Sequence, residues 1–125
     1  MQTPYELLGG EPGVRRLAGA LYQVMHADPE AATIRAMHQK DLAEVSDKLF
    51  KFLSGWLGGP QLYLQEYGTI CLSEPHARYG IGSAERDQWL SCMAQALDKV
   101  GASAELKAML EEPMFQLADV MRNRD

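Results

Sequence analysis

The chain contains 125 residues, of which 46% are hydrophobic and 23% are charged. A chain of this length forms one domain, and its composition is that of an ordinary globular protein rather than of a disordered one. The formal net charge is −5 at pH 7. This charge argues against nucleic acid as a partner, because phosphate binding needs a concentrated basic surface. We therefore expect a single domain over residues 1–125.

The sequence carries no signal for export or for membrane insertion. Its first residues lack the basic stretch followed by an apolar stretch that a secretory signal peptide has. No apolar run approaches the ~18 residues that a membrane-spanning helix needs. The two cysteines, Cys71 and Cys92, form no CxxC motif and are expected to be reduced and packed. These features predict a cytoplasmic protein without a membrane partner.

Apolar residues at helical spacing dominate the first third of the chain. Glu11-Pro12-Gly13 opens a long helix, and apolar residues then recur every three or four positions over residues 14–25. Asp28-Pro29 supplies an N-cap and a first helical residue for the next, short helix over residues 30–37.

The central helix is expected to begin after Asp41, which is suited to cap it. It ends at Gly58-Gly59-Pro60, because glycine accepts a left-handed cap and proline cannot continue a helix. At least one of these two glycines should therefore have a positive φ. One or two helical turns are expected over residues 61–67, and the segment from there to Gly80-Ile81-Gly82 is interpreted as loop or short helix.

Two strong helices are predicted in the last third. Ser83 is expected to cap the first, which ends at Gly101 and buries Trp89, Leu90, Met93, Leu97, Val100 and the stem of Arg86. Ser103 is expected to cap the second, which Pro113 should kink. Its apolar stripe includes Leu106, Leu110, Leu117, Val120 and Met121. Because no segment alternates with the period of a strand, the fold class is all-α.

The residues alone leave the chemistry open. The three histidines, His26, His38 and His76, form no HExxH pattern, and the chain contains no GxSxG, P-loop or GxGxxG motif. Tyr22 and Trp89 both lie on the apolar face of a predicted helix. Each is either a core aromatic with a satisfied polar tip or one of two groups that converge on a ligand, and periodicity does not choose between these.

Short motifs over nearly the whole chain resemble those of group II truncated haemoglobins. Glycine pairs precede the first long helix and follow the central one. Residues 85–93 match the pattern Glu-Arg-Asp-x-Trp-Leu-x-Cys-Met, whose tryptophan is typical of group II. His76 lies thirteen residues before Trp89, which is the spacing of the family's iron ligand. Other matching segments are Leu21-Tyr22, Ala36-Met37-His38 and Phe115-Gln116-Leu117-Ala118-Asp119.

The resemblance implies an all-α truncated globin fold, a two-over-two helical sandwich around haem b. It implies that His76 binds the haem iron. It also places three side chains on the distal side, where an external ligand binds: Tyr22, His38 and Trp89. The helix patterns are compatible with an apolar lining of the haem slot by Phe52, Leu53 and Met93, although the same residues could be plain core.

The segment before His76 departs from the family pattern. The family has basic residues directly before its iron ligand, whereas Ser73-Glu74-Pro75 precedes His76 here. The propionate carboxylates of haem therefore need cations from elsewhere in the chain. We expect these contacts from Lys48, Lys51 and Arg78.

The implied function is reversible binding of dioxygen or another diatomic ligand at the haem iron. Bound dioxygen carries partial negative charge, so hydrogen-bond donors on the distal side stabilise it. The same groups are compatible with nitric-oxide dioxygenation or peroxidase-like chemistry, which would involve an unidentified reductase. The alternative from another class is a haem-free helical adaptor or regulatory module, whose apolar faces are only core.

Overall fold

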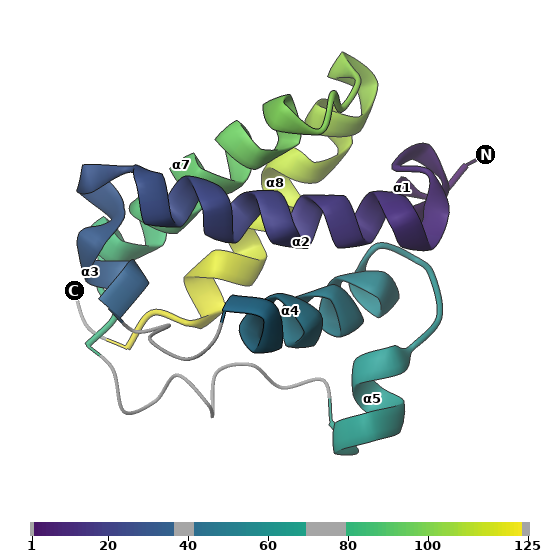
Figure 1. The fold of residues 1–125 in the computed structure, drawn as a ribbon, viewed down its shortest axis with the longest axis horizontal. Coiled ribbons are helices and arrows are strands. Elements are labelled where there is room, and N and C mark those ends of the chain that lie inside the picture. Colours follow the sequence, from purple (N-terminus) through teal and green to yellow (C-terminus); the bar gives the residue numbers. More distant parts are fainter. Residues whose placement is uncertain (1, 37–41, 70–79, 124–125) are drawn as a thin grey trace.

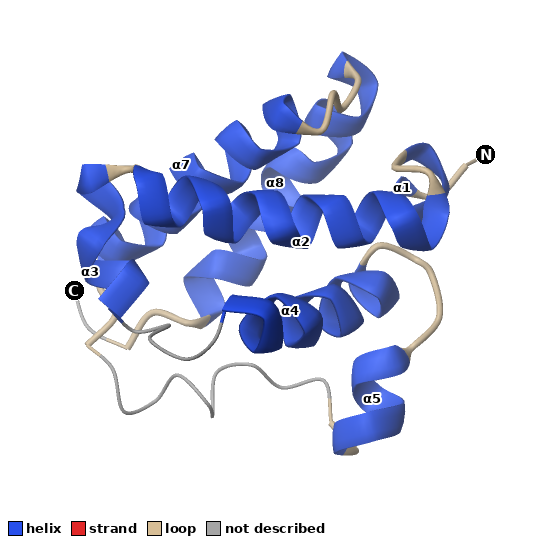
Figure 2. Ribbon diagram, viewed as in Figure 1, coloured by secondary structure: helices blue, strands red, loops and turns tan. Residues whose placement is uncertain are grey.

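The computed structural model describes residues 2–36, 42–69 and 80–123. Within these ranges all regular structure is helical, as Figure 2 shows. The elements are α1 (Pro4–Leu7), α2 (Gly10–Ala27), the 3-10 helix η1 (Pro29–Ala31), α3 (Ala32–Ala36), α4 (Leu42–Trp56), α5 (Leu62–Tyr67), α7 (Ser83–Lys99) and α8 (Ala104–Val120). The all-α prediction is confirmed.

The four long helices form two pairs. α2 packs against α4 on one side and against α7 on the other, and α8 packs against α7 (Figure 1). The short helix α5 contacts α4, and α1 contacts α2 and α8. This arrangement is the predicted two-over-two helical sandwich.

The core lies where α2 meets α4 and α7. The predicted apolar face of α2 is confirmed, since Val14, Leu17 and Leu21 are fully buried. α4 adds Phe50 and Leu53, the turn after it adds Leu57, and α7 adds Cys92, Met93, Ala96 and Leu97. Burial of such side chains stabilises a fold by about 1.5–3 kcal/mol each for the larger aliphatic and aromatic residues. This core fixes the faces that α2, α4 and α7 present to one another.

The turn after α4 uses its two glycines for different reasons. Gly58 has a φ of 103°, which confirms the predicted left-handed residue. Gly59 is needed for space instead, because a Cβ atom there would lie 2.4 Å from the ring of Tyr5. The Tyr5 backbone N–H also donates to the Leu57 carbonyl at 3.0 Å. Helix α1 is thereby fixed to the end of α4.

Helix α1 was not predicted, although the sequence contains its signal. The Thr3 hydroxyl accepts a hydrogen bond from the Glu6 backbone N–H at 3.1 Å. The Glu6 carboxylate accepts one from the Thr3 backbone N–H at 3.0 Å. These two bonds form a capping box, which the pattern Thr-x-x-Glu indicates.

Several predicted helix ends are confirmed and two are wrong. Asp28 and Ser103 cap their helices through side-chain oxygens, and α7 ends just before Gly101. However, α2 begins at Gly10, one residue before the predicted start. Ser83 is the first residue of α7 and Gly82 is its N-cap. The Glu85 carboxylate accepts a hydrogen bond from the Gly82 backbone N–H at 2.7 Å. Asp41 lies outside the described residues.

The predicted apolar stripe of α8 is wrong at its C-terminal end. Val120 is 61% exposed. The buried residues follow each other at intervals of four, and they are Leu106, Leu110, Met114 and Ala118. Val120 follows Ala118 by two residues, which puts it on nearly the opposite side of the helix from this buried stripe. The helix extends through Pro113 without interruption.

Candidate functional site

Tyr22 lies on the face of α2 that points into the core. It is only 6% exposed, in agreement with its predicted position on an apolar face. Burial raises the pKa of the Tyr22 hydroxyl to about 12, because the charged phenolate loses its hydration there. The hydroxyl therefore keeps its proton over the whole physiological pH range and acts as a neutral hydrogen-bonding group.

Trp89 approaches the same core from α7. It is partly buried and packs against the core cluster that contains Tyr22. Its indole N–H can only donate a hydrogen bond. Met93 follows one turn later on α7 and is fully buried. Since α2 and α7 pack against each other, the two aromatic side chains with polar tips come from neighbouring helices.

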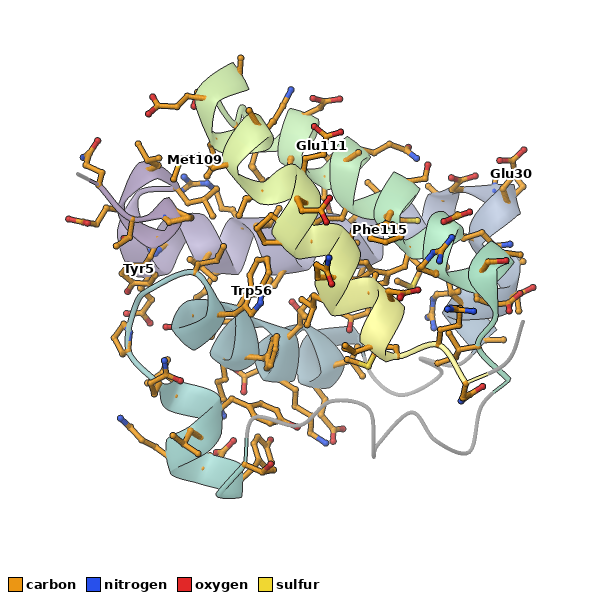
Figure 3. All side chains as sticks on the ribbon, turned by 180° about the vertical axis from the view of Figure 1, so that it is seen from behind. Tyr5, Glu30, Trp56, Met109, Glu111 and Phe115 are labelled. Atoms are coloured by element: carbon orange, nitrogen blue, oxygen red, sulfur yellow. The ribbon has the colours of Figure 1, made fainter. Side chains whose placement is uncertain are left out.

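Helix α4 presents two apolar strips side by side. The first is buried in the core and includes Leu53, which is completely inaccessible to solvent. The second recurs at steps of four, three and four residues, so its members share one side of the helix: Val45, Leu49, Phe52 and Trp56. Figure 3 shows Trp56 at the C-terminal end of this helix.

The second strip is less completely covered than the first. Val45, Leu49 and Trp56 are only partly buried by the rest of the chain. Phe52 is buried, and its ring contacts Tyr63 of α5 edge-on with centroids 5.7 Å apart. Thus the predicted pair Phe52 and Leu53 is divided between the two strips. Val45 and Trp56 were not among the expected haem-lining residues, although their spacing to Phe52 puts them on the same strip.

The two lysines of α4 differ in their surroundings. The Lys51 ammonium lies 2.9 Å from Asp47 and 2.8 Å from Glu66 of α5. These carboxylates raise the pKa of Lys51, and the hydrogen bond to Glu66 is the largest cause. Lys48 forms no ion pair with any residue that the structure describes, and its ammonium lies 5.8 Å from the ring centroid of Tyr67. Lys48 is therefore the freer of the two for an anionic ligand.

Three predicted site residues lie outside the described residues, namely His38, His76 and Arg78. The described part of the chain holds no group of three or more His, Cys, Asp or Glu residues that could bind a metal ion. It also contains no helix that is long and apolar enough to span a membrane. Cys92 is a buried free thiol, as expected, and burial raises its pKa.

Comparison with known proteins identifies the family. Residues 3–123 match the family model of bacterial-like globins. The chain is 35% identical over 108 residues to the group 2 truncated hemoglobin YjbI of Bacillus subtilis (strain 168), covering 86% of this chain and 79% of that protein.

Solved structures agree with this match. A cold-adapted truncated hemoglobin from the Antarctic marine bacterium Pseudoalteromonas haloplanktis is 38% identical, with a TM-score of 0.93 over 99% of this chain and 100% of that one. The group II 2-on-2 hemoglobin of Agrobacterium tumefaciens is also 38% identical, with a TM-score of 0.92 over 100% and 97% of the two chains. This chain belongs to the group II truncated haemoglobins.

Membership of this family makes haem b the cofactor and a diatomic ligand of its iron the molecule that is bound. The described residues of this truncated haemoglobin fit such a cofactor. Haem is an apolar disc, and α4 offers an apolar strip that the rest of the chain leaves partly uncovered. Tyr22 and Trp89 add neutral hydrogen-bonding groups at the border of the same core, and Lys48 adds a cation.

Proposed function

We propose that this truncated haemoglobin binds dioxygen reversibly, with His76 as the iron ligand and with Tyr22 and Trp89 as donors to the bound gas. The observation that carries the proposal is the placement of two neutral hydrogen-bonding side chains, from α2 and α7, in one apolar core. Haem supplies the iron position to which dioxygen binds. The protein's contribution is to surround that position with apolar walls and a small number of donors.

The protonation state of Tyr22 suits this function. Because its pKa is raised to about 12, the hydroxyl carries its proton at neutral pH. The indole of Trp89 is a donor at any pH. Hydrogen bonds are stronger in apolar surroundings than in water, so both groups can stabilise the partial negative charge on bound dioxygen.

Nitric-oxide dioxygenation and peroxidase-like chemistry are the alternatives for the same site, since donors beside the iron would serve them as well. Proton delivery in a redox cycle would fall to His38, whose side-chain type titrates near neutrality. Such a cycle would also need electrons from an external reductase.

An absorption spectrum of the purified protein tests the haem assignment, because a Soret band separates a haem protein from a haem-free helical adaptor. Addition of haemin to the apo-protein repeats the test if the cofactor is lost during purification. Reversible spectral change of the ferrous form on cycling between dioxygen and nitrogen is the expected result. Irreversible oxidation within one cycle would contradict oxygen binding as the function.

The iron ligand is tested by replacing His76 with alanine. Loss of the iron's protein bond should weaken haem retention, and added imidazole should partly restore the spectrum. His26→Ala is the matched control, because His26 is exposed near the end of α2. Equal haem content and equal ferrous spectra in both variants would exclude His76 as the ligand.

A further inference from the structure

Helix α5 carries two tyrosines one turn apart whose rings are in contact. The ring centroids of Tyr63 and Tyr67 lie 4.6 Å apart, and the ring planes are tilted by 42°. Tyr63 also makes the edge-on contact with Phe52 of α4. Both centroid distances lie in the range of attractive aromatic pairs. Three rings in contact thus lead from the second strip of α4 to α5, which lies at the edge of the fold (Figure 1).

Of these three rings, that of Tyr67 is the one that solutes reach most easily. Tyr67 is 40% exposed, whereas Tyr63 is partly buried and Phe52 is buried. The other tyrosines that the structure describes are less accessible, since Tyr22 lies in the core and Tyr5 is partly buried. Among the described tyrosines, Tyr67 is therefore the one best placed to exchange an electron with a molecule in solution.

A proton acceptor is already bound to this phenol. Loss of hydration and a hydrogen bond to the Glu66 carboxylate both raise the pKa of Tyr67, so its phenol is protonated at neutral pH. The Lys51 ammonium donates to both oxygens of Glu66, at 3.0 and 2.8 Å, and thereby lowers the pKa of that carboxyl. Removal of an electron makes a phenol strongly acidic. The ionised Glu66 is in position to take its proton.

The charges around Tyr67 favour loss of the electron and the proton together. The Lys48 ammonium lies 5.8 Å from the ring centroid of Tyr67. This cation opposes a positive charge on the ring, because like charges repel each other. Transfer of the proton to Glu66 leaves a neutral phenoxyl radical, on which the repulsion no longer acts. The second cation, Lys51, is compensated by the two carboxylates that it contacts.

We propose that Tyr67 is an oxidation site, at which hydrogen peroxide acting through the haem removes electrons from the protein and small phenols in solution return them. The inference goes beyond oxygen binding. It rests on the haem, which supports one-electron chemistry, and on the expected place of Phe52 beside it. The row of rings from Phe52 to Tyr67 then connects the haem slot with the surface.

The reaction balances with peroxide as the oxidant and the phenol as the reductant. In one step Tyr67 loses an electron toward the haem and a proton to Glu66, which passes the proton to water. A small phenol then gives a hydrogen atom to the Tyr67 radical, which restores the tyrosine and leaves a phenoxyl radical in solution. Two such steps deliver two electrons and two protons to one hydrogen peroxide, which becomes two molecules of water.

Each part of the site has a matched control. Tyr67→Phe removes the hydroxyl and keeps the ring, and Tyr5→Phe does the same at a tyrosine outside the row. Glu66→Gln removes the proton acceptor. Asp47→Asn is its control, because it also takes one carboxylate from Lys51 but leaves the partner of Tyr67 in place. All four substitutions nearly preserve side-chain size, so each variant should keep the haem content of wild type, which its Soret band measures.

The experiment mixes the ferric holoprotein with hydrogen peroxide. Electron paramagnetic resonance of rapidly frozen samples detects the tyrosyl radical, and oxidation of guaiacol, a small phenol, is followed in parallel. Wild type and Tyr5→Phe should form the radical and oxidise guaiacol. Tyr67→Phe should lose the radical signal and most of the guaiacol oxidation. If the two tyrosines only pack α5 against α4, the two tyrosine variants should behave alike.

The proton acceptor is tested by the rate of radical formation. Glu66→Gln should form the radical about tenfold to a hundredfold more slowly, which is at and below the lower limit for a positioned base because water also reaches this exposed phenol. Asp47→Asn should keep the wild-type rate. In heavy water the wild type should slow down more than Glu66→Gln, if the proton leaves with the electron in the wild type.

The proposal is overturned if Tyr67→Phe keeps the wild-type radical, or if the wild-type signal is that of a tryptophan radical. Equal rates in Glu66→Gln and Asp47→Asn would overturn the role of Glu66. A protein that shows a Soret band and binds dioxygen reversibly but forms no Tyr67-dependent radical refutes this inference alone. A protein without a Soret band refutes the proposed function and this inference with it.

Discussion

The core that α2 shares with α4 and α7 and the corner between α4 and α5 hold their polar groups in opposite ways. In the core Tyr22 is buried, and its pKa is raised by loss of hydration. At the corner the ammonium of Lys51 is shared by the carboxylates of Asp47 and Glu66, whose pKa values its hydrogen bonds lower. The core therefore contains a neutral polar group, whereas the charged groups of the corner lie at the surface and pair with one another.

This contrast predicts that substitutions in the core have larger effects than substitutions at the corner. Exposed ion pairs contribute little to stability, because water and salt screen them. A neutral donor in an apolar core acts in weakly screened surroundings, so its removal has larger consequences. Four predictions test this contrast.

The largest effect is expected from loss of core volume in α4. Leu53→Ala should lower the free energy of unfolding by about 2–5 kcal/mol, because the fully buried side chain leaves a cavity. Leu64→Ala is the control at the corner, since Leu64 is 42% exposed on α5. It should change the free energy by no more than about 0.5 kcal/mol. Urea unfolding of the apo-proteins measures both, and equal losses would contradict the contrast.

The second prediction concerns alkaline pH. The Tyr22 pKa rises from its ordinary value of 10.0 to about 12 on folding. The neutral form is thus favoured in the folded state, and this contribution is complete below pH 10 and is lost as the pH rises toward 12. At most about 2–3 kcal/mol is involved. Over this range the unfolding free energy of wild type should fall relative to that of Tyr22→Phe, which has no hydroxyl to titrate. An unchanged difference would contradict the raised pKa.

The third prediction tests Trp89 as a donor. Trp89→Phe keeps most of the apolar bulk and removes the indole N–H. Dioxygen should leave about tenfold to a hundredfold faster, since partly charged dioxygen lies between a neutral acceptor, worth about 0.5–1.5 kcal/mol, and a charged one, worth about 1.5–3 kcal/mol. Carbon monoxide carries less negative charge on its outer atom and should respond less. Stopped-flow release of both gases measures this, and equal acceleration would make Trp89 a steric gate instead.

The smallest effect is expected at the corner. The lowered pKa values of Asp47 and Glu66 mean that their contribution to stability is present above the ordinary carboxyl range and lost as the pH falls through it. Lys51→Met should remove this acid-dependent part and should make stability less sensitive to salt. Unfolding curves at pH 3 and pH 7, at low and high salt, measure both dependences. An unchanged acid dependence in Lys51→Met would remove the lysine as its cause.

The sequence predicted those parts of this fold that depend on local pattern. The apolar face of α2, the caps at Asp28 and Ser103 and the left-handed glycine at Gly58 all follow from residues close to each other in the chain. The burial of Tyr22 on the inner face of α2 also follows from such a local pattern. The signal for helix α1, Thr3 with Glu6, is equally local, although this helix was not predicted.

The parts that could not be predicted depend on residues far apart in the chain. The partner of Lys51 in the structure, Glu66, lies on another helix 15 residues away. The expected contact of Lys51 with a haem propionate stays a prediction. The packing partners of α8 decide that Met114 and Ala118 are buried and that Val120 is exposed. Likewise, nothing in the segment around Ile81 indicates that Asn123 will bind it. Such pairings follow only from the three-dimensional arrangement of the helices.

The contact of Tyr5 with the turn after α4 has a consequence for synthesis on the ribosome. The Tyr5 N–H reaches the Leu57 carbonyl, and its ring packs against Gly59. Translation at about 5–20 residues per second separates the emergence of these two segments by several seconds. During that interval the segment that α1 will contact has not yet emerged. We therefore expect α1 to be accessible to chaperones and proteases until the central helix and the turn after it have left the exit tunnel.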